Sequence, residues 1–420
     1  MSLFFLCLEV FTYGFAFYLL MAKKELALLY LPVLFFADLV ITPAAPALAY
    51  YATISLLLAS LILRNSTFFR YNIFALLIII YFLLLLPQSS NLEFIRPYIF
   101  GVVWLFISLP LIHAIYQKYS REIIFQELAR SALLILMIFS ANVLVSSLYK
   151  YSPYSMYGIT SGVLYGNMYA VDFNILPIAV FITTLSLIKR KNIFQFLILV
   201  LAITFIMLTL RRSVMGLSMA GIICGFVISI TQKNMKKVLV YGGITLLIGY
   251  IILTNTEFMS VFNERYELRN LENRELEEEK RFIEYELVYR DMFIYQDYSP
   301  WFGFELFNSW GNYGRGVLVE RSLHSDLTSI AHSSGLIGLA LYILMVFTAF
   351  RQSYRHAATT RDKLIFLFSG MTFLVFTTTG RYTETGNMMF LFLVLLLPLT
   401  QEDPAHQDVA ALAPNNRVAA

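Results

Sequence analysis

Charged residues are scarce in this chain of 420 residues. Asp, Glu, Lys and Arg make up 14% of it and hydrophobic residues 59%, whereas soluble globular chains carry about 25% charge. This composition excludes an ordinary soluble domain and indicates a membrane protein. The net charge of +4 is small, and the basic residues gather in short connections. The sequence therefore predicts no nucleic-acid partner, which would need a basic face on a soluble domain.

Cysteine is nearly absent. Cys7 and Cys224 both lie in apolar runs, so they indicate neither a disulfide framework nor metal-ligand spacing. The apolar N-terminus lacks a basic leader and a small-residue cleavage site. We interpret it as a retained first span rather than a signal peptide.

Apolar runs of about 20 residues, long enough to cross a bilayer, recur along the chain. We expect an all-α, polytopic membrane protein with about 12 or 13 transmembrane helices. The predicted spans are 3–21, 26–42, 45–63, 72–87, 97–117, 129–149, 168–188, 193–209, 213–230, 237–254, 324–350, 363–379 and 386–400. These give four regions: about ten helices in 1–254, a loop domain in 255–323, further helices in 324–400 and a disordered tail in 401–420.

Lysine and arginine mark one set of alternate connections, and such connections are cytoplasmic in membrane proteins. The first set holds Lys23, Lys24, Arg64, Arg70, Lys118, Arg121, Arg130, Lys189, Arg190, Lys191, Lys233, Lys236, Lys237, Arg351, Arg355, Arg361 and Lys363. The short connections of the other set hold Arg96, Lys150, Arg211, Arg212 and Arg381. The tail is then cytoplasmic, and the N-terminus and 255–323 lie outside, which in a bacterium is the periplasm.

Region 255–323 is the long polar segment of the chain. Its first half, which includes 264–295, has no Gly or Pro and reads as a helix. Its second half is rich in Gly and aromatic residues and reads as an irregular loop. We place two substrate-binding candidates in that second half, Tyr313 and Arg321.

Arg211 and Arg212 interrupt a run, 192–230, that is otherwise uncharged. As one helix the run would measure about 58 Å, nearly twice a bilayer core, so it must fold back near the pair. Charges at membrane depth are costly and usually functional, and the planar guanidinium suits a diphosphate. The alternative is that both arginines extend to lipid phosphates.

Arg290 shares a helical stripe with Ile283, Leu287 and Ile294, so it lies on an apolar face and is expected to point toward a ligand. The alternative is an ordinary i,i+4 ion pair with Glu286.

His324 stands where the polar segment meets the next apolar helix. Neutral histidine accepts a proton near pH 7, as a general base must. Asp326 is a substrate-binding candidate and a rival base, and Ser325 or Asp326 could instead cap the helix that follows. We expect His332, deeper in that helix, to be a packed polar residue.

Together these stretches resemble the O-antigen ligase and polysaccharide polymerase superfamily. LHSDLTSIAHSSGLIGL resembles its signature, a His followed by Asn or Asp and then Gly-x-x-Gly opening a span. TLRRSVMGL resembles its Arg-bearing turn, and YRDMFIYQDYSPWFGFE its loop element. All three occur in the family's order, and the resemblance covers roughly 192–350.

The resemblance implies a GT-C-like, metal-independent glycosyl transfer that uses no cofactor. It makes His324 the group that handles the acceptor hydroxyl, and Arg290 with Arg211 or Arg212 the groups that stabilise the leaving diphosphate. Many members carry an acid where this chain has His332, and ligases more often have Asn where it has Asp326. His-Ser-Asp therefore favours the polymerases slightly.

The predicted function is a polymerase that transfers a glycan from undecaprenyl diphosphate to another lipid-linked repeat unit at the periplasmic face of the inner membrane. A ligase, which transfers the glycan to lipid A-core, is the alternative. A lipid-linked saccharide transporter is a third, and Asp172 would be its first candidate residue. The bilayer is the expected surrounding, and a chain-length regulator or a flippase the expected protein partner.

Overall fold

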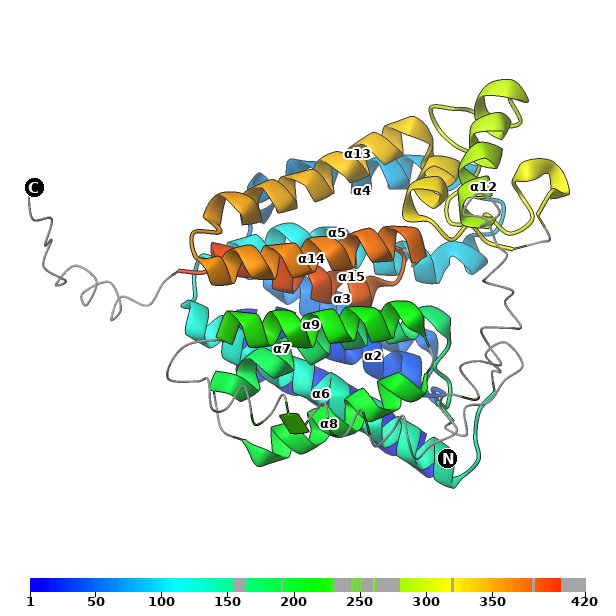
Figure 1. Ribbon diagram of the computed structural model, residues 1–420. Helices are drawn as coiled ribbons and strands as arrows, with labels where there is room; N and C mark the ends of the chain where they lie inside the picture. The colour runs from blue at the N-terminus through cyan, green and yellow to red at the C-terminus, as the bar shows by residue number, and fades with distance from the viewer. Residues whose placement is uncertain are drawn as a thin grey trace, which may run out of the picture.

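The computed structural model describes residues 1–153, 164–189, 192–209, 211–229, 280–318, 321–379 and 382–401, with a few more between 240 and 260. These residues form a bundle of apolar helices that run along a shared direction (Figure 1). Six helical runs are long and apolar enough to cross a membrane, and four shorter ones accompany them. The predicted all-α, polytopic membrane fold is confirmed.

The first part of the bundle consists of antiparallel helices joined by short turns. They are α1 (Ser2–Tyr18), α2 (Leu31–Val40), α3 (Ala47–Arg64), α4 (Ile73–Leu85), α5 (Leu92–Tyr116) and α6 (Arg121–Leu148). The chain reverses at Lys24, where φ is 51°, so Phe15 packs against Tyr30 at 5.6 Å between ring centroids. The turn between α2 and α3 is fixed to α1: Glu9 accepts hydrogen bonds from the amides of Ala44 and Ala45, both at 2.9 Å.

The second part contains α7 (Ile175–Lys189), α8 (Ile193–Leu208), α9 (Arg212–Ser229), α12 (Lys280–Tyr289), α13 (Asp326–His356), α14 (Thr360–Thr379) and α15 (Thr385–Leu395). The predicted fold-back inside 192–230 is confirmed, because α8 ends at Leu208 and α9 begins at Arg212. The predicted span 237–254 lies largely outside the described residues. Residues 261–279 of the predicted loop helix and the tail 402–420 lie outside them too.

Helix α6 begins eight residues earlier than the predicted span and takes in three charged residues, Arg121, Glu122 and Glu127. Glu127 accepts hydrogen bonds from Lys23 at 2.7 Å and from Arg130 at 2.5 Å. The Tyr30 hydroxyl donates to the same carboxylate. Because the charges neutralise one another, the helix can carry them where hydropathy alone predicts a break.

The bundle has two distinct ends. One, here named the loop end, holds the N-terminus, α12 and the start of α13; the other, the tail end, holds the last described residue, Gln401 (Figure 1). Contacts agree with this division. Ser120, at the start of α6, pairs with Gln401, and Arg121 forms an ion pair with Asp362 at the start of α14.

Helix α15 occupies the centre of the bundle. Every residue from Thr385 to Leu395 is buried, and the helix packs against α2, α5, α7 and α14. A helix that is apolar on all sides is expected to be enclosed in this way. The connection that enters α15 is thereby held at the middle of the loop end, where it meets the start of α13.

Candidate active site at the loop end

Helix α12 organises the polar segment through an acidic residue on its buried face. Glu284 is fully buried, and Leu287, Val288 and Met292 on the same face are nearly so. One turn further, Asp291 is 1% exposed and accepts a hydrogen bond from the amide of Gly314 at 2.7 Å. Two carboxylates, one on α12 and one on the π turn that continues it, therefore hold the loop that follows.

Glu284 gathers the residues that precede α13. Its Oε2 accepts from the backbone amide of His324 at 2.9 Å, and its Oε1 lies 3.2 Å from His324 Nδ1. The Arg321 guanidinium forms an ion pair with the same Oε1. The His324 side chain remains 35% exposed while the carboxylate is not exposed at all. The arrangement is a buried acid that holds an accessible histidine.

The charge state of Glu284 fixes how the histidine is oriented. Burial alone would raise the pKa of this carboxyl. Hydrogen bonds from the His324 side chain and amide, with the charge of Arg321, instead hold that pKa below its usual value. An ionised carboxylate only accepts, so Nδ1 of neutral His324 must carry the proton and Nε2 is left as an acceptor. Nε2 is the atom that could take a proton from a hydroxyl.

The predicted helix cap is wrong. Ser325 occupies the N-cap position of α13 but makes no side-chain capping bond; its hydroxyl instead lies 2.5 Å from that of Tyr285. Asp326 is fully buried, and its Oδ1 accepts from the amide of Tyr382 at 2.6 Å. Asp326 thus ties the start of α13 to the connection before α15, and its burial removes it from the surface where a rival base would act.

A break at Gly335 within α13 helps to position the start of that helix. Gly335 has φ 65° and ψ −169°, which is not helical, and a Cβ there would lie 2.3 Å from the carbonyl of Trp301. The Ser299–Phe304 turn fills the gap: the amide of Leu336 donates to Pro300 O at 2.8 Å, and that of Phe304 to His332 O at 2.7 Å. Only glycine tolerates both this backbone and this close approach.

His332 is buried at this break, as predicted. Its ring packs against Tyr298 and Phe304, with centroids 5.0 and 5.5 Å apart, and its Nε2 donates to Asn312 O at 3.0 Å. It therefore belongs to the packing of the loop on α13.

The prediction that Arg290 lies on an apolar face is wrong. The buried face of α12 carries Glu284, Leu287 and Val288, and Arg290 lies off that face: its side chain is 45% exposed and pairs with Glu286. A π turn follows at Arg290–Ile294. Ile294, from the same predicted stripe, is 59% exposed. The ordinary i,i+4 pair is what forms.

Arg211 and Arg212 lie at the same end of the bundle but on another side. Arg211 is half-buried and Arg212 exposed, and the Arg211 guanidinium stands 5.8 Å from the ring centroid of Phe173. In Figure 1, α14 and α15 lie between α9 and α13. The two regions are linked in steps: Asn387 donates to Val171 O at 3.0 Å, and Tyr382, five residues earlier, donates to Asp326.

The remaining two candidates join the Glu284 cluster. Arg321 is held by Glu284, and Tyr313 is buried beside His332 and Leu287. Burial raises the pKa of the Tyr313 phenol, and the charge of Glu284 adds to that rise. The structure thus brings His324, Arg321 and Tyr313 together. It leaves Arg290 on the outer face of α12 and the Arg211–Arg212 turn on the far side of α15.

Sequence reasoning missed Glu284. A signal was present, because Glu284 stands three and four residues before Leu287 and Val288, on the face that a helix buries. An acid on such a face needs a partner, and the chain supplies it forty residues later. Within the described ranges, no group of three or more His, Cys, Asp or Glu side chains is arranged as metal ligands.

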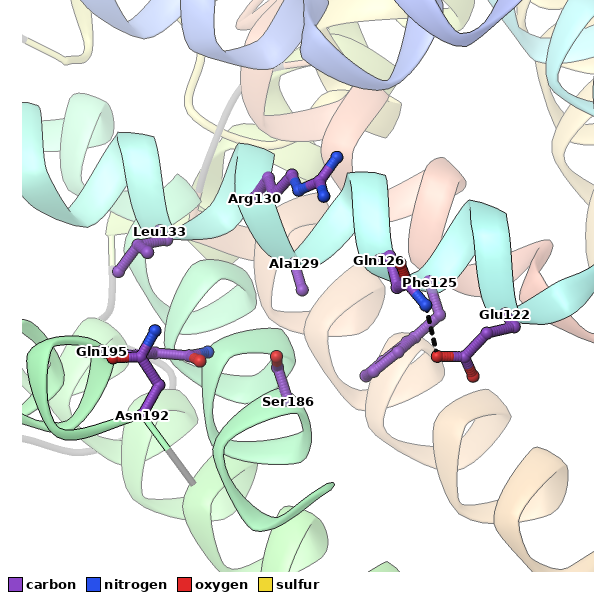
Figure 2. Close-up of a pocket in the computed structure, with 9 residues that line it drawn as sticks. All are labelled: Glu122, Phe125, Gln126, Ala129, Arg130, Leu133, Ser186, Asn192 and Gln195. Carbon is purple, nitrogen blue, oxygen red and sulfur yellow. Dashed lines mark hydrogen bonds between the residues drawn. The ribbon is translucent and has the colours of Figure 1, made fainter. Parts of the chain in front are cut away.

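A polar pocket also exists at the opposite end of the bundle, between α6, α7 and α8 (Figure 2). Gln126 donates to Glu122 at 2.6 Å on its α6 side, and Gln195 on α8 donates to Thr183 O at 3.2 Å. Because it lies at the tail end, this pocket is separate from the His324 site.

No family model and no curated protein matches the chain. The resemblance drawn from its three motifs therefore stays a prediction.

Proposed function

We propose that the protein is a bacterial inner-membrane glycosyltransferase whose active site lies at the loop end, facing the periplasm. In this proposal it is a polysaccharide polymerase, which transfers a glycan from undecaprenyl diphosphate to a sugar hydroxyl of another lipid-linked repeat unit. The observation that carries the proposal is the buried Glu284 carboxylate holding the accessible His324 in one orientation. A base held by a third group is how proteins activate a hydroxyl.

The reaction needs a proton acceptor and a stabilised leaving group. The acceptor oxygen forms a bond to the anomeric carbon while the bond from that carbon to the diphosphate breaks. The hydroxyl proton passes to Nε2 of His324, and Glu284 stabilises the imidazolium that results. Departure leaves negative charge on the diphosphate, and fixed guanidinium groups lower the cost of that charge.

Arg211 and Arg212 are the proposed partners of the leaving diphosphate. They are the cations of the α8–α9 turn at the loop end, and Arg212 is exposed there. A lipid-linked donor that enters beside α9 would pass over the connection that leads into α15 before its sugar reaches His324. Arg290 contributes less in this proposal, because Glu286 already neutralises it.

Two other functions remain as alternatives. A ligase would use the same donor with lipid A-core as acceptor, and the His324 geometry suits both. A transporter is favoured by a separate observation, the electrostatic interaction between Asp172 and Glu384 at the loop end. Paired acids near a membrane-spanning segment are a feature of ion-coupled transport.

Purified protein in proteoliposomes distinguishes the three functions. Supplied with lipid-linked repeat units alone, a polymerase extends them into a ladder resolved by chain length. A ligase makes no ladder and needs lipid A-core for transfer, whereas a transporter moves the lipid-linked unit without changing its glycan. Absence of any new glycosidic bond with either acceptor would contradict the proposal.

A further inference from the structure

A second pocket opens at the loop end, on the other side of the residues that carry His324. It lies between α5, α13 and the loop around Phe307, and Leu323 forms part of its wall. The amide of Leu323 donates to Ser309 Oγ at 3.0 Å on the pocket side, while the next amide, that of His324, donates to Glu284. Consecutive residues thus join the pocket to the proposed base, with Cα atoms about 3.8 Å apart.

Aromatic side chains form much of the pocket's wall. These are Phe94, Tyr98, Phe307, Trp310 and Tyr382. The Phe307 backbone is left-handed, with φ 58°, a conformation that costs a bulky residue energy and clusters at functional sites. Its ring packs against Phe82, Tyr98 and Tyr382, with centroids 5.7 to 6.2 Å apart. The surrounding rings therefore hold Phe307 in place against this strain.

Hydroxyl groups supply the polar part of the pocket. They belong to Ser309, Ser322, Ser329, Ser333 and Thr383. Ser329 and Ser333 stand one turn apart on α13, so both present their hydroxyls to the same side. A serine or threonine hydroxyl both donates and accepts, which matches the hydroxyls of a sugar.

Charge is the feature that the described part of this wall lacks. Among the described residues that line the pocket, none is acidic or basic. Glu305, two residues before Phe307, is occupied: its Oε1 accepts from the amide and hydroxyl of Ser90 at 2.6 and 2.8 Å. A diphosphate would need cations here. The hydroxyls of Ser309 and Ser333 accept from the amides of Leu323 and Phe307, and an acyl chain would offer their O–H groups no acceptor.

We infer that this pocket is a subsite for an uncharged sugar ring of the acceptor, and that it selects neutral sugars over uronic acids. The aromatic faces would stack on the C–H face of the ring, and the serine hydroxyls would bind its edge. This inference rests on the proposed glycosyl transfer only where it identifies the bound sugar as part of the acceptor. The binding of a neutral sugar itself does not depend on it.

Binding can be measured without turnover. The full-length protein in nanodiscs is titrated with the oligosaccharide repeat unit released by mild acid from the lipid-linked pool of its native cells, and saturation-transfer NMR reports the contact. Neutral disaccharides and the same disaccharides oxidised to uronates form a second probe pair. We expect the neutral form to bind at least about tenfold more tightly, since a carboxylate there would be desolvated without a partner.

Three variants test the location of binding. Ser329→Met fills the pocket and should weaken binding about tenfold or more, and Trp310→Ala removes one aromatic face and should weaken it by up to about tenfold. Trp301→Phe is the matched control, because this exposed tryptophan lies outside the pocket. Trp310 is 55% exposed, so its variant folds even if Ser329→Met does not.

The outcomes separate the subsite from the chemistry. Loss of binding in Ser329→Met and Trp310→Ala, with normal binding in His324→Ala and Trp301→Phe, supports the subsite. Equal binding in all four variants, or tighter binding of uronates, overturns it even if the enzyme polymerises. If the sugar binds in this pocket but no glycosidic bond forms with either acceptor, the proposed function fails and the sugar site stands.

Discussion

Two buried glutamates, one at each end of the bundle, show how the same arrangement serves different purposes. Glu127 at the tail end binds Lys23, Arg130 and the Tyr30 hydroxyl. Glu284 at the loop end binds Arg321 and His324. The charged partners of Glu127, Lys23 and Arg130, are cations that keep their charge at any physiological pH. One partner of Glu284 is a histidine with a second ring nitrogen that can gain and lose a proton.

The difference indicates a fixed tail end and a reactive loop end. At the tail end, Arg121 pairs with Asp362 and Lys118 with Glu25, so opposite charges on different helices neutralise one another. At the loop end, the hydrogen bonds of Glu284 orient the His324 side chain, which remains 35% exposed. Substitutions at the two ends should therefore affect stability alike and activity differently.

The largest expected effect is that of His324→Ala. Loss of the proposed base should reduce polymer formation by about 10²–10⁴-fold while the protein still folds and binds its lipid-linked donor. His324→Gln should keep some positioning but no basicity. The exposed His356 at the tail end is the matched control, and His356→Ala should polymerise normally. Equal activity in His324→Ala and His356→Ala would contradict the claim that the loop end is reactive and the tail end is not.

Next come the arginines of the α8–α9 turn. Arg211→Ala or Arg212→Ala should lower turnover by about 10²–10³-fold, the usual loss for one electrostatic contact to a developing charge. Lysine should restore it only in part, because it lacks the bidentate fork. Arg355→Ala, which removes an exposed arginine near the tail end, serves as the control. Full activity in both single variants and in the double variant would show that the pair only anchors the span.

Some of the features behind these predictions could be predicted from the sequence, and others could not. Hydropathy located α1 to α9 and α13 to α15 because burial in lipid demands long apolar runs, and the uncharged run 192–230 disclosed the Arg211 turn by its length. The hydrogen-bond partners of the buried acids could not be predicted from the sequence. Glu284 meets His324 and Asp326 meets Tyr382 across 40 and 56 residues, and nothing local selects these partners. The choice of which face of α12 is buried, which leaves Arg290 exposed, and the break at Gly335 also depend on tertiary contacts.

A third prediction compares Glu284→Gln with Glu127→Gln. Each should cost about 1–3 kcal/mol of stability, because a charged acceptor is lost to buried donors, and chemical denaturation measures this. Activity should fall only for Glu284→Gln. A similar loss of activity in both variants would indicate a general effect of stability.

The same glutamate predicts a pH dependence. Because the folded pKa of Glu284 lies below its ordinary value of 4.5, its contribution to stability is present above that value. It is lost as the pH falls through the folded pKa. Wild type should therefore lose stability in that acid range, and Glu284→Gln should lose less of it over the same interval. Parallel pH profiles would contradict the assignment.

The smallest effect is expected from Asp326. Asp326→Ala leaves the buried amide of Tyr382 without its acceptor and should cost about 1–3 kcal/mol, with a modest loss of turnover through displacement of the α13 start. Asp326→Asn retains an acceptor oxygen and should recover most of both. A well-folded Asp326→Ala protein that makes no polymer, beside an active His324→Ala, would instead make Asp326 the base.

The central claim is that Glu284 acts through His324, and a double-mutant cycle on turnover tests it most directly. Polymer formation is measured for wild type, Glu284→Gln, His324→Ala and the double variant, with protein level and lipid-linked donor binding checked in each. If the two residues form one unit, the double variant will be no slower than His324→Ala alone, because the orientation of an absent base no longer matters. If the two losses multiply instead, Glu284 and His324 act independently and the account is contradicted.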